Sequence, residues 1–220
     1  DLFWFDGRGY YDEQRTGRSL ADYRLTPWAT LDTTRFAREY YALNDSGYFV
    51  RDGQGRATVE RFDLVRRREV TNRHYGWVPR VALTHARGTL TVGGELRLHD
   101  GRHVGSLLSA VGAGSDFAPA ARYYDYHPRT LSAGLFVREE FNATSTLRVT
   151  GDLAWRHQGY AMRDDRFDGI AFDQSYDFAL PRLGVSWTPT PAWNAFASYA
   201  YASREPAFRD LYDAEGVGSV

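Results

Sequence analysis

Histidine is the residue type in this chain best suited to bind a metal ion, and the 220-residue sequence contains six of them. Two of these, His99 and His103, lie four positions apart. On a helix this spacing would bring both rings to one side, but on a strand or in a loop it has no such meaning. Two histidines without a carboxylate cluster seldom complete a coordination shell. We therefore predict no metal site, and no cofactor motif is present.

The best candidates for ligand contact lie in a stretch rich in Gly, Ser, Asp and Tyr, roughly residues 99–128. We expect this stretch to be a long loop, and function tends to concentrate in loops. For any one of the candidates, ordinary loop packing is the more frequent role. The candidate ligand-binding residues are His103, Arg122, Tyr123, Tyr124, Asp125 and His127.

Two further charged groups could have a role. Asp164, Asp165 and Asp168 could offer oxygens to Ca²⁺, but their spacing fits no known calcium loop, so we predict a solvated loop. Three consecutive arginines, residues 66–68, would alternate sides on a strand. Arg67 would then point outward, where it could meet anionic groups such as phosphates, and its two neighbours inward.

Composition and motifs exclude several classes of function. The chain has no cysteine, and its net charge of −1 leaves no basic excess for nucleic acid. It contains no nucleophile elbow, phosphate loop or zinc-binding His-Glu pair, so we predict that it is not an enzyme. No apolar run approaches the ~18 residues of a membrane helix, although a membrane strand would not show such a run.

Apolar and polar residues alternate along most of the chain, which predicts β-strands. These strands must position the candidate residues. From about residue 75 onward, such segments are separated in turn by tight connections and by long polar loops. We predict about seven strands, at residues 2–11, 61–85, 89–98, 129–141, 146–160, 176–187 and 192–203. The long stretch 12–60 is predicted to be a loop.

The segregation of loop lengths distinguishes two all-β architectures. Short turns at one end and long loops at the other are typical of bacterial outer-membrane barrels. A soluble β-sandwich would also alternate, but its loop lengths need not segregate by end. We therefore predict an all-β, antiparallel up-and-down meander that forms part of a larger transmembrane β-barrel.

The alternation also assigns residues to the two faces of the predicted sheet. Trp187 and Trp193, which flank the turn at residues 188–191, should join an aromatic girdle at the periplasmic interface. One face should contact lipid and contains Leu90, Val92, Leu96, Leu147, Val149, Leu153, Leu183 and Val185. The other face is of mixed charge, as in a wet lumen, and contains Arg80, Glu95, Arg97, Arg138, Arg148, Asp152, Arg156 and Arg182.

Several segments resemble the late barrel of TonB-dependent outer-membrane receptors. The main resemblance is a hairpin formed by residues 178–189 (FALPRLGVSWTP) and 193–206 (WNAFASYAYASREP), followed by 208–212 (FRDLY). Residues 203–206 (SREP) are a fairly specific element of it. Weaker resemblances occur in the expected order at residues 3–11, 75–80, 94–97 with His103, and 152–157.

This resemblance implies an energised uptake channel in the bacterial outer membrane. Such a receptor is a barrel of about 22 strands with a plugged lumen. The expected partners are its own plug domain, the TonB complex, outer-membrane lipid and lipopolysaccharide, and an iron chelate or similar scarce nutrient. The ligand expected first is an iron–siderophore complex.

The chain departs from the family pattern in what it lacks. We find no plug domain, no TonB-contacting box and no final strand ending in an aromatic residue, so residues 1–220 are expected to be a partial barrel. About seven strands cannot close such a barrel, and open sheet edges are not stable in lipid. Two alternatives stay open: a passive outer-membrane porin and a soluble β-sheet domain that binds carbohydrate.

Overall fold

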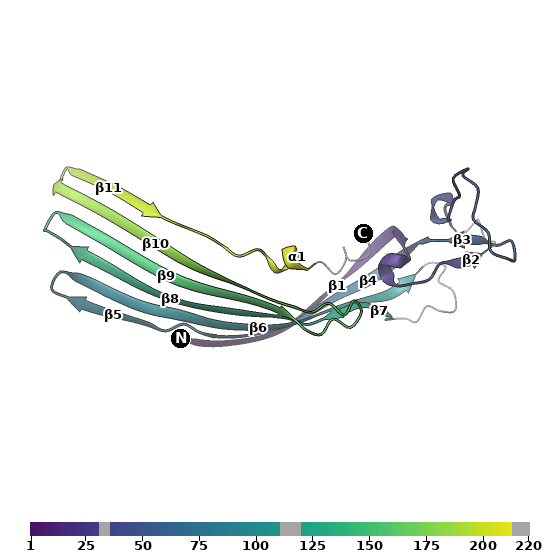
Figure 1. Ribbon diagram of the computed structural model, residues 1–220, viewed down its shortest axis with the longest axis horizontal. Helices are drawn as coiled ribbons and strands as arrows, with labels where there is room; N and C mark the ends of the chain where they lie inside the picture. Colours follow the sequence, from purple (N-terminus) through teal and green to yellow (C-terminus); the bar gives the residue numbers. More distant parts are fainter. Residues whose placement is uncertain (31–35, 111–119, 213–220) are drawn as a thin grey trace.

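The computed structural model describes residues 1–30, 36–110 and 120–212, and within them the chain forms one long antiparallel sheet (Figure 1). Seven strands follow one another across this sheet, which confirms the predicted all-β meander. They are β1 (Leu2–Ser19), β4 (Arg61–Trp77), β6 (Gly88–Ala110), β8 (Pro128–Asn142), β9 (Leu147–Met162), β10 (Phe172–Thr190) and β11 (Trp193–Ala200). Two shorter strands, β5 (Arg80–His85) and β7 (Arg122–Tyr126), pair with β6 beside this path.

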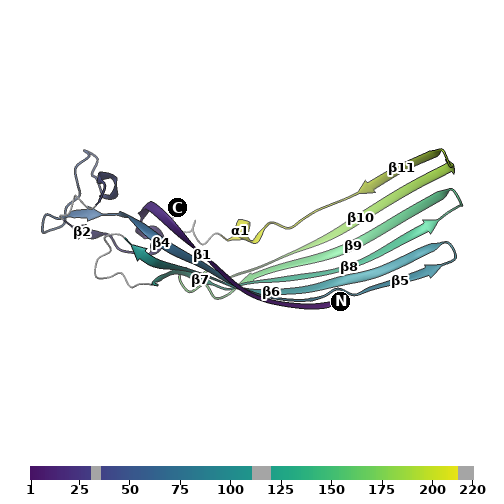
Figure 2. The same cartoon turned by 180° about the vertical axis from the view of Figure 1, so that it is seen from behind.

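The tight connections lie together at one end of the sheet, whereas the long connections lie at the other (Figures 1 and 2). The turn between β8 and β9 is closed by Thr144, whose hydroxyl accepts hydrogen bonds from the amides of Thr146 and Leu147. The turn after β10 contains Pro191, which has no amide hydrogen to offer a strand ladder. The predicted segregation of short turns and long loops is therefore confirmed for the described residues.

Several predictions of strand extent were wrong, mostly because strands continue beyond the alternating region. The single strand predicted at residues 61–85 is interrupted at residues 78–79, between β4 and β5. β1 extends to Ser19, and β6 runs on to Ala110 instead of ending at Leu98. Residues 122–126 form β7 where a loop was predicted. In these extensions both faces carry polar residues, so the alternation that reveals a strand disappears. Backbone pairing with β4 and β7 nevertheless continues along β6.

The two faces of the sheet are distinguished by the segment that follows β11. This segment, which includes the short helix α1 (Phe208–Leu211), crosses the concave side of the sheet (Figure 1). Arg156 binds Glu205 at 2.8 Å, and the Tyr160 hydroxyl donates to the carbonyl of Pro206. Side chains that share the side of Arg156 are therefore on the concave face, called the inner face below, and the alternate side chains are on the outer face.

Cross-strand pairing places the predicted apolar set on the outer face. Val92, Val137 and Leu153 are paired in one row across three strands, and Leu147 is paired with Trp187. None of the predicted outward residues lies against a second sheet, and Leu153 is 54% exposed. Trp187 and Trp193 are 50% and 73% exposed beside the last hairpin turn, not enclosed in a core.

The outer apolar face has a sharp upper limit. Its last row across the sheet consists of Trp4, Tyr75, Leu98, Leu131, Gly159 and Ser175, and the next row consists of Asp6, Arg73, Asp100, Arg129, Ala161 and Asp173. Along β9 the apolar rows run from Leu147 to Gly159, which lie twelve residues apart. At ~3.3 Å per residue and ~45° of tilt this is about 28 Å, close to the apolar band of a membrane barrel. We call these rows the apolar band.

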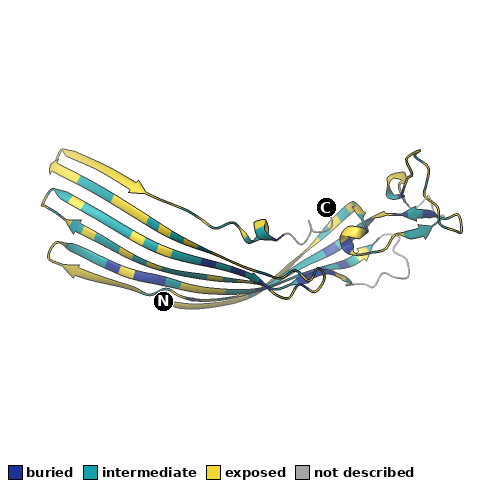
Figure 3. Cartoon of the chain, viewed as in Figure 1, coloured by how far each residue is buried: buried dark blue, intermediate teal, exposed yellow. Residues whose placement is uncertain are grey.

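One buried stretch lies on β6 near the short turns, but most buried residues lie beyond the apolar band, at the end with long connections (Figure 3). A 3-10 turn, η1 (Ala21–Tyr23), covers the inner face there. The resulting core contains Leu20, Tyr23, Phe62, Leu64, Leu107, Tyr123 and Tyr124. A smaller core lies under the two-stranded sheet of β2 (Trp28–Thr30) and β3 (Ala57–Val59), near a second 3-10 turn, η2 (Arg38–Tyr40). In the described ranges, no helix is both long and apolar enough to span a membrane.

Candidate ligand-binding site

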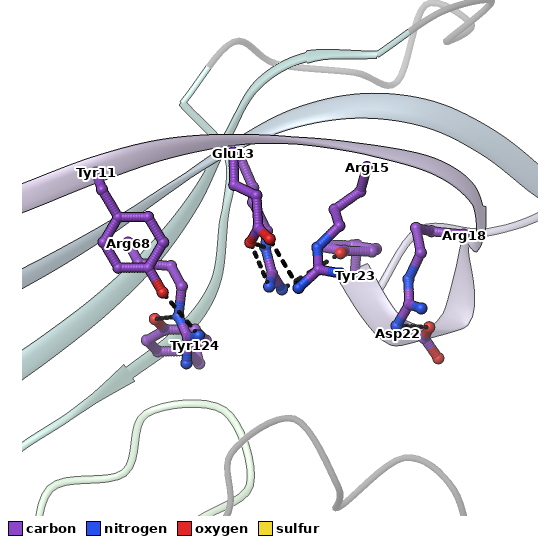
Figure 4. Close-up of polar contacts among 9 residues, drawn as sticks. Tyr11, Glu13, Arg15, Arg18, Asp22, Tyr23, Arg68 and Tyr124 are labelled. Carbon is purple, nitrogen blue, oxygen red and sulfur yellow. Dashed lines mark hydrogen bonds and ion pairs between the residues drawn. The ribbon is translucent and has the colours of Figure 1, made fainter.

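The inner face beyond the apolar band holds a polar and aromatic surface built by β1, β4, β6 and β7. Tyr11, Arg68, Gly105 and Tyr124 are paired across these four strands in one row. The Arg68 guanidinium donates to the hydroxyls of Tyr11 at 2.9 Å and Tyr124 at 3.2 Å, as Figure 4 shows. Gly105 leaves room for this arrangement, because an added Cβ would lie 2.4 Å from the Tyr124 ring. A cation held between two phenols is the result.

A second set of charged residues lies next to this row, toward the end of β1. The guanidinium of Arg66 is only 3% exposed and makes two hydrogen bonds to Glu13, at 2.8 and 3.0 Å. Arg15 approaches the other oxygen of Glu13 at 2.8 Å (Figure 4). These cations hold the pKa of Glu13 below its usual range, mainly through the hydrogen bonds from Arg66. The Glu13 carboxylate therefore stays ionised. It holds Arg66 and Arg15 in place beside the row that contains Arg68.

His103 occupies the next row toward the apolar band, and its ring stacks on Tyr126 with centroids 5.0 Å apart. Burial lowers the pKa of His103 to about 4, and electrostatic repulsion from His99 and Arg68 acts in the same direction. The imidazole is therefore neutral at pH 7. A neutral ring stacked on a phenol offers a flat surface for aromatic or apolar groups.

Asp125 lies on the opposite side of the sheet from His103, although both were predicted to contact a ligand. Its carboxylate is completely buried and accepts hydrogen bonds from Arg102 at 2.8 and 2.9 Å and from Arg122 at 3.0 Å. Arg166 approaches it at 3.4 Å. Burial would raise the pKa of Asp125, but the bonds and charges of these arginines outweigh it and lower the pKa. Asp125 fixes β7 to its neighbours.

The six sequence-predicted residues therefore divide into three groups. His103, Tyr123 and Tyr124 come together on the inner side, but the two tyrosines are only 4% and 3% exposed and act as supports of the surface. Asp125 and Arg122 belong to the outer cluster. His127 lies in the short corner between β7 and β8, where its Nδ1 is buried without a hydrogen-bond partner among the described residues.

Tyr11, Arg68 and Tyr126 are the members of the inner surface that sequence reasoning missed. Tyr11 is 52% exposed, so its ring is accessible from the lumen side. Arg68 and Tyr11 are separated by 57 positions in the sequence, and only the register of β1 against β4 brings them together. The one available signal was the expected alternation of residues 66–68, which correctly placed Arg66 and Arg68 inward and Arg67 outward.

Two of the three carboxylates in the acidic cluster of residues 164–168, those of Asp165 and Asp168, bind protein partners. Asp165 accepts hydrogen bonds from the amides of Phe167 and Asp168 and, at 2.9 Å, from the buried hydroxyl of Tyr212. Burial and this carboxylate raise the pKa of Tyr212. Asp168 is paired with Arg24. Within the described ranges no three His, Cys, Asp or Glu side chains are grouped as a metal site would need.

Comparison with known proteins agrees with this architecture. The family model described as "TonB dependent receptor-like, beta-barrel" matches residues 1–219, nearly the whole chain. No curated protein and no solved structure matches the chain. Proteins of this family are receptors and transporters of the bacterial outer membrane rather than enzymes. The chain belongs to the TonB-dependent receptor family and forms part of its β-barrel domain.

Proposed function

We propose that the full-length receptor takes up an iron–siderophore complex by energy-coupled transport, and that the surface around Arg68 and Tyr11 contacts this ligand. The observation behind the proposal is the guanidinium held between two phenols on the inner face above the apolar band. A cation beside the exposed ring of Tyr11 suits an anionic or aromatic chelate. His103, stacked on Tyr126, extends the same surface.

We also infer that the apolar band contacts the hydrocarbon of the outer membrane, because its height of about 28 Å matches that layer. Cations on the outer face above the band would then meet phosphates of lipopolysaccharide. Arg67 is the residue predicted for this contact, but it already binds Asp12 at 2.7 Å. Arg122 and Arg166, 47% and 60% exposed around Asp125, are the better candidates.

The ligand can be tested with membranes from cells that express the full-length receptor. The probes are ⁵⁵Fe-labelled ferric catecholate and ferric hydroxamate, with labelled cobalamin and maltooligosaccharide for comparison. We expect saturable binding of an iron chelate, and uptake in cells that stops when a protonophore removes the energy source. Binding of only cobalamin or sugar would overturn the iron assignment. Uptake that continues without energy would support the passive-porin alternative instead.

A matched pair of variants tests the site. Arg68→Gln removes the inner guanidinium, and we expect it to raise the Kd for the chelate about tenfold, the effect of one charged hydrogen bond. Arg67→Gln changes the next residue in the same way, but on the outer face, and should leave the Kd unchanged. Equal effects of the two substitutions would contradict the proposed contact surface. The remaining alternative, a soluble carbohydrate-binding domain, is not compatible with the outer-membrane family.

A further inference from the structure

The inner face also carries a cationic hollow within the height of the apolar band. A cavity of about 260 Å³ is lined there by Arg80, Thr91, Phe136, Arg138, Asp152, Ala154 and Arg182. Cross-strand pairing puts Thr91, Arg138, Asp152 and Arg182 in one row over four adjacent strands. Arg80 belongs to the next row, which continues through Gly93, Phe136 and Ala154. Three guanidinium groups thus surround one carboxylate.

The charges of this hollow do not balance within the described part of the chain. The carboxylate of Asp152 forms an ion pair with Arg138, with N–O distances of 2.8 and 2.9 Å, and its side chain is only 10% exposed. Arg80 and Arg182 are exposed, and neither has an ion-pair or hydrogen-bond partner among the described residues. The hollow therefore carries two positive charges that no carboxylate of the described residues compensates.

The family to which the chain belongs explains why such charges need a partner. In full-length receptors of this family a plug domain occupies the lumen of the barrel. A plug in contact with the wall would remove water from Arg80 and Arg182, and an unpaired charge that loses its water is costly. A carboxylate placed between two guanidinium groups would compensate this cost with charge-assisted hydrogen bonds.

We propose that this hollow is a docking site for acidic side chains of the plug domain, with Arg80 and Arg182 as the two cations that bind them. The depth of the site suits such a contact. Asp152 lies five residues above Leu147 on β9, close to half the height of the apolar band. Thr91 and Ala154, which line the hollow, have small side chains and leave space between the arginines. This inference depends on the family and its plug, and not on the identity of the transported ligand.

The test uses the full-length receptor in planar lipid bilayers, where plug unfolding by urea opens the barrel to ions. For the double variant Arg80→Gln/Arg182→Gln we expect the urea midpoint of channel opening to fall by about 1 M. Arg182→Glu should lower it further, because it places a like charge against the plug carboxylates. Arg80→Lys/Arg182→Lys retains both charges and should retain most of the parent midpoint.

The matched control is Arg148→Gln. Arg148 is an inner-face arginine of β9 that lies two rows nearer the β8–β9 turn than Asp152, outside the hollow. It should leave the midpoint unchanged. Heat-modifiable gel mobility shows for each variant that the barrel itself is folded. Equal midpoints in the parent, Arg148→Gln and the double Gln variant would overturn the proposal. Slower ligand uptake with an unchanged midpoint would also overturn it, and would indicate an anion pathway instead.

Because conductance is measured without ligand and without the energy source, it does not depend on the proposed iron uptake. Failure of iron binding would leave the plug contact standing, and an unchanged urea midpoint would leave the iron proposal standing. The two proposals are therefore tested separately.

Discussion

An arginine at Leu153 should weaken the folded receptor more than an arginine at any nearby position of β9. Leu153 lies on the outer face, six residues from Leu147 and six from Gly159, the limits of the apolar band. At ~3.3 Å per residue and ~45° of tilt it is about 14 Å from either limit, at the middle of the hydrocarbon layer. A charged side chain there costs roughly 2 to 4 kcal/mol of folding free energy.

Two neighbouring substitutions provide the comparison. Val149 is also on the outer face, paired with Phe141 and Val185, but it lies only two residues from Leu147. Its replacement by arginine should cost about 0 to 1 kcal/mol, as is usual near the interface. Thr150, paired with Glu140 and Gly184, is on the inner face, so Thr150→Arg should have almost no effect on folding into the membrane.

The measurement is urea-titrated folding of the full-length receptor into lipid vesicles, followed by tryptophan fluorescence and by heat-modifiable gel mobility. The expected order of destabilisation is Leu153→Arg, then Val149→Arg, then Thr150→Arg. An equal or larger loss for Thr150→Arg would refute the assignment of the two faces. An equal loss for Val149→Arg and Leu153→Arg would refute the depth worked out from the register.

Three other predictions concern the region beyond the apolar band. Because the pKa of His103 falls to about 4 on folding, the unfolded chain binds more protons than the folded chain between pH 6.5 and 4. Acidification through this window should lower the free energy of unfolding around His103 by at most about 3 kcal/mol. Amide-exchange protection of β6 measures this loss, and the pH dependence should disappear in His103→Gln. Asp125→Asn should lower protection of β7 by about 2 kcal/mol, while leaving the membrane strands unchanged. Tyr212→Phe removes the hydroxyl bound to Asp165 and should cost about 1 kcal/mol, seen as faster exchange at the amides of Phe167 and Asp168.

The sequence predicted the membrane half of the fold well for a physical reason. Between Leu90 and Leu98, and between Leu147 and Trp155, one face must be apolar and the other polar, so the pattern follows the strand. Beyond Leu98 both faces of β6 are polar in many rows, and the same backbone geometry leaves no pattern. The strand continues because β4 and β7 satisfy its backbone groups.

The candidate site was only partly predictable. His103 and Tyr124 were found because they lie in a polar, aromatic stretch of the chain, but their burial depends on η1, a segment distant in sequence. Asp125 was predicted as a ligand contact because it is charged. In the structure it is buried in ion pairs with Arg102 and Arg166, so its role is structural. Tyr11 and Arg68 become neighbours only through strand register, which composition does not reveal.

The abrupt change from the last apolar row to the charged row above it has a consequence for membrane thickness. The charges of the upper row alternate in sign along most of its length. The distance between the charged groups is 3.7 Å for Asp6 and Arg73, and 3.4 Å for Asp100 and Arg129. A shift of two residues along the strands, about 5 Å vertically, would immerse these charges or expose Tyr75 and Leu98 to water. The receptor wall therefore has a single preferred depth, and it should fit a bilayer whose hydrocarbon layer is near 28 Å better than a thicker one.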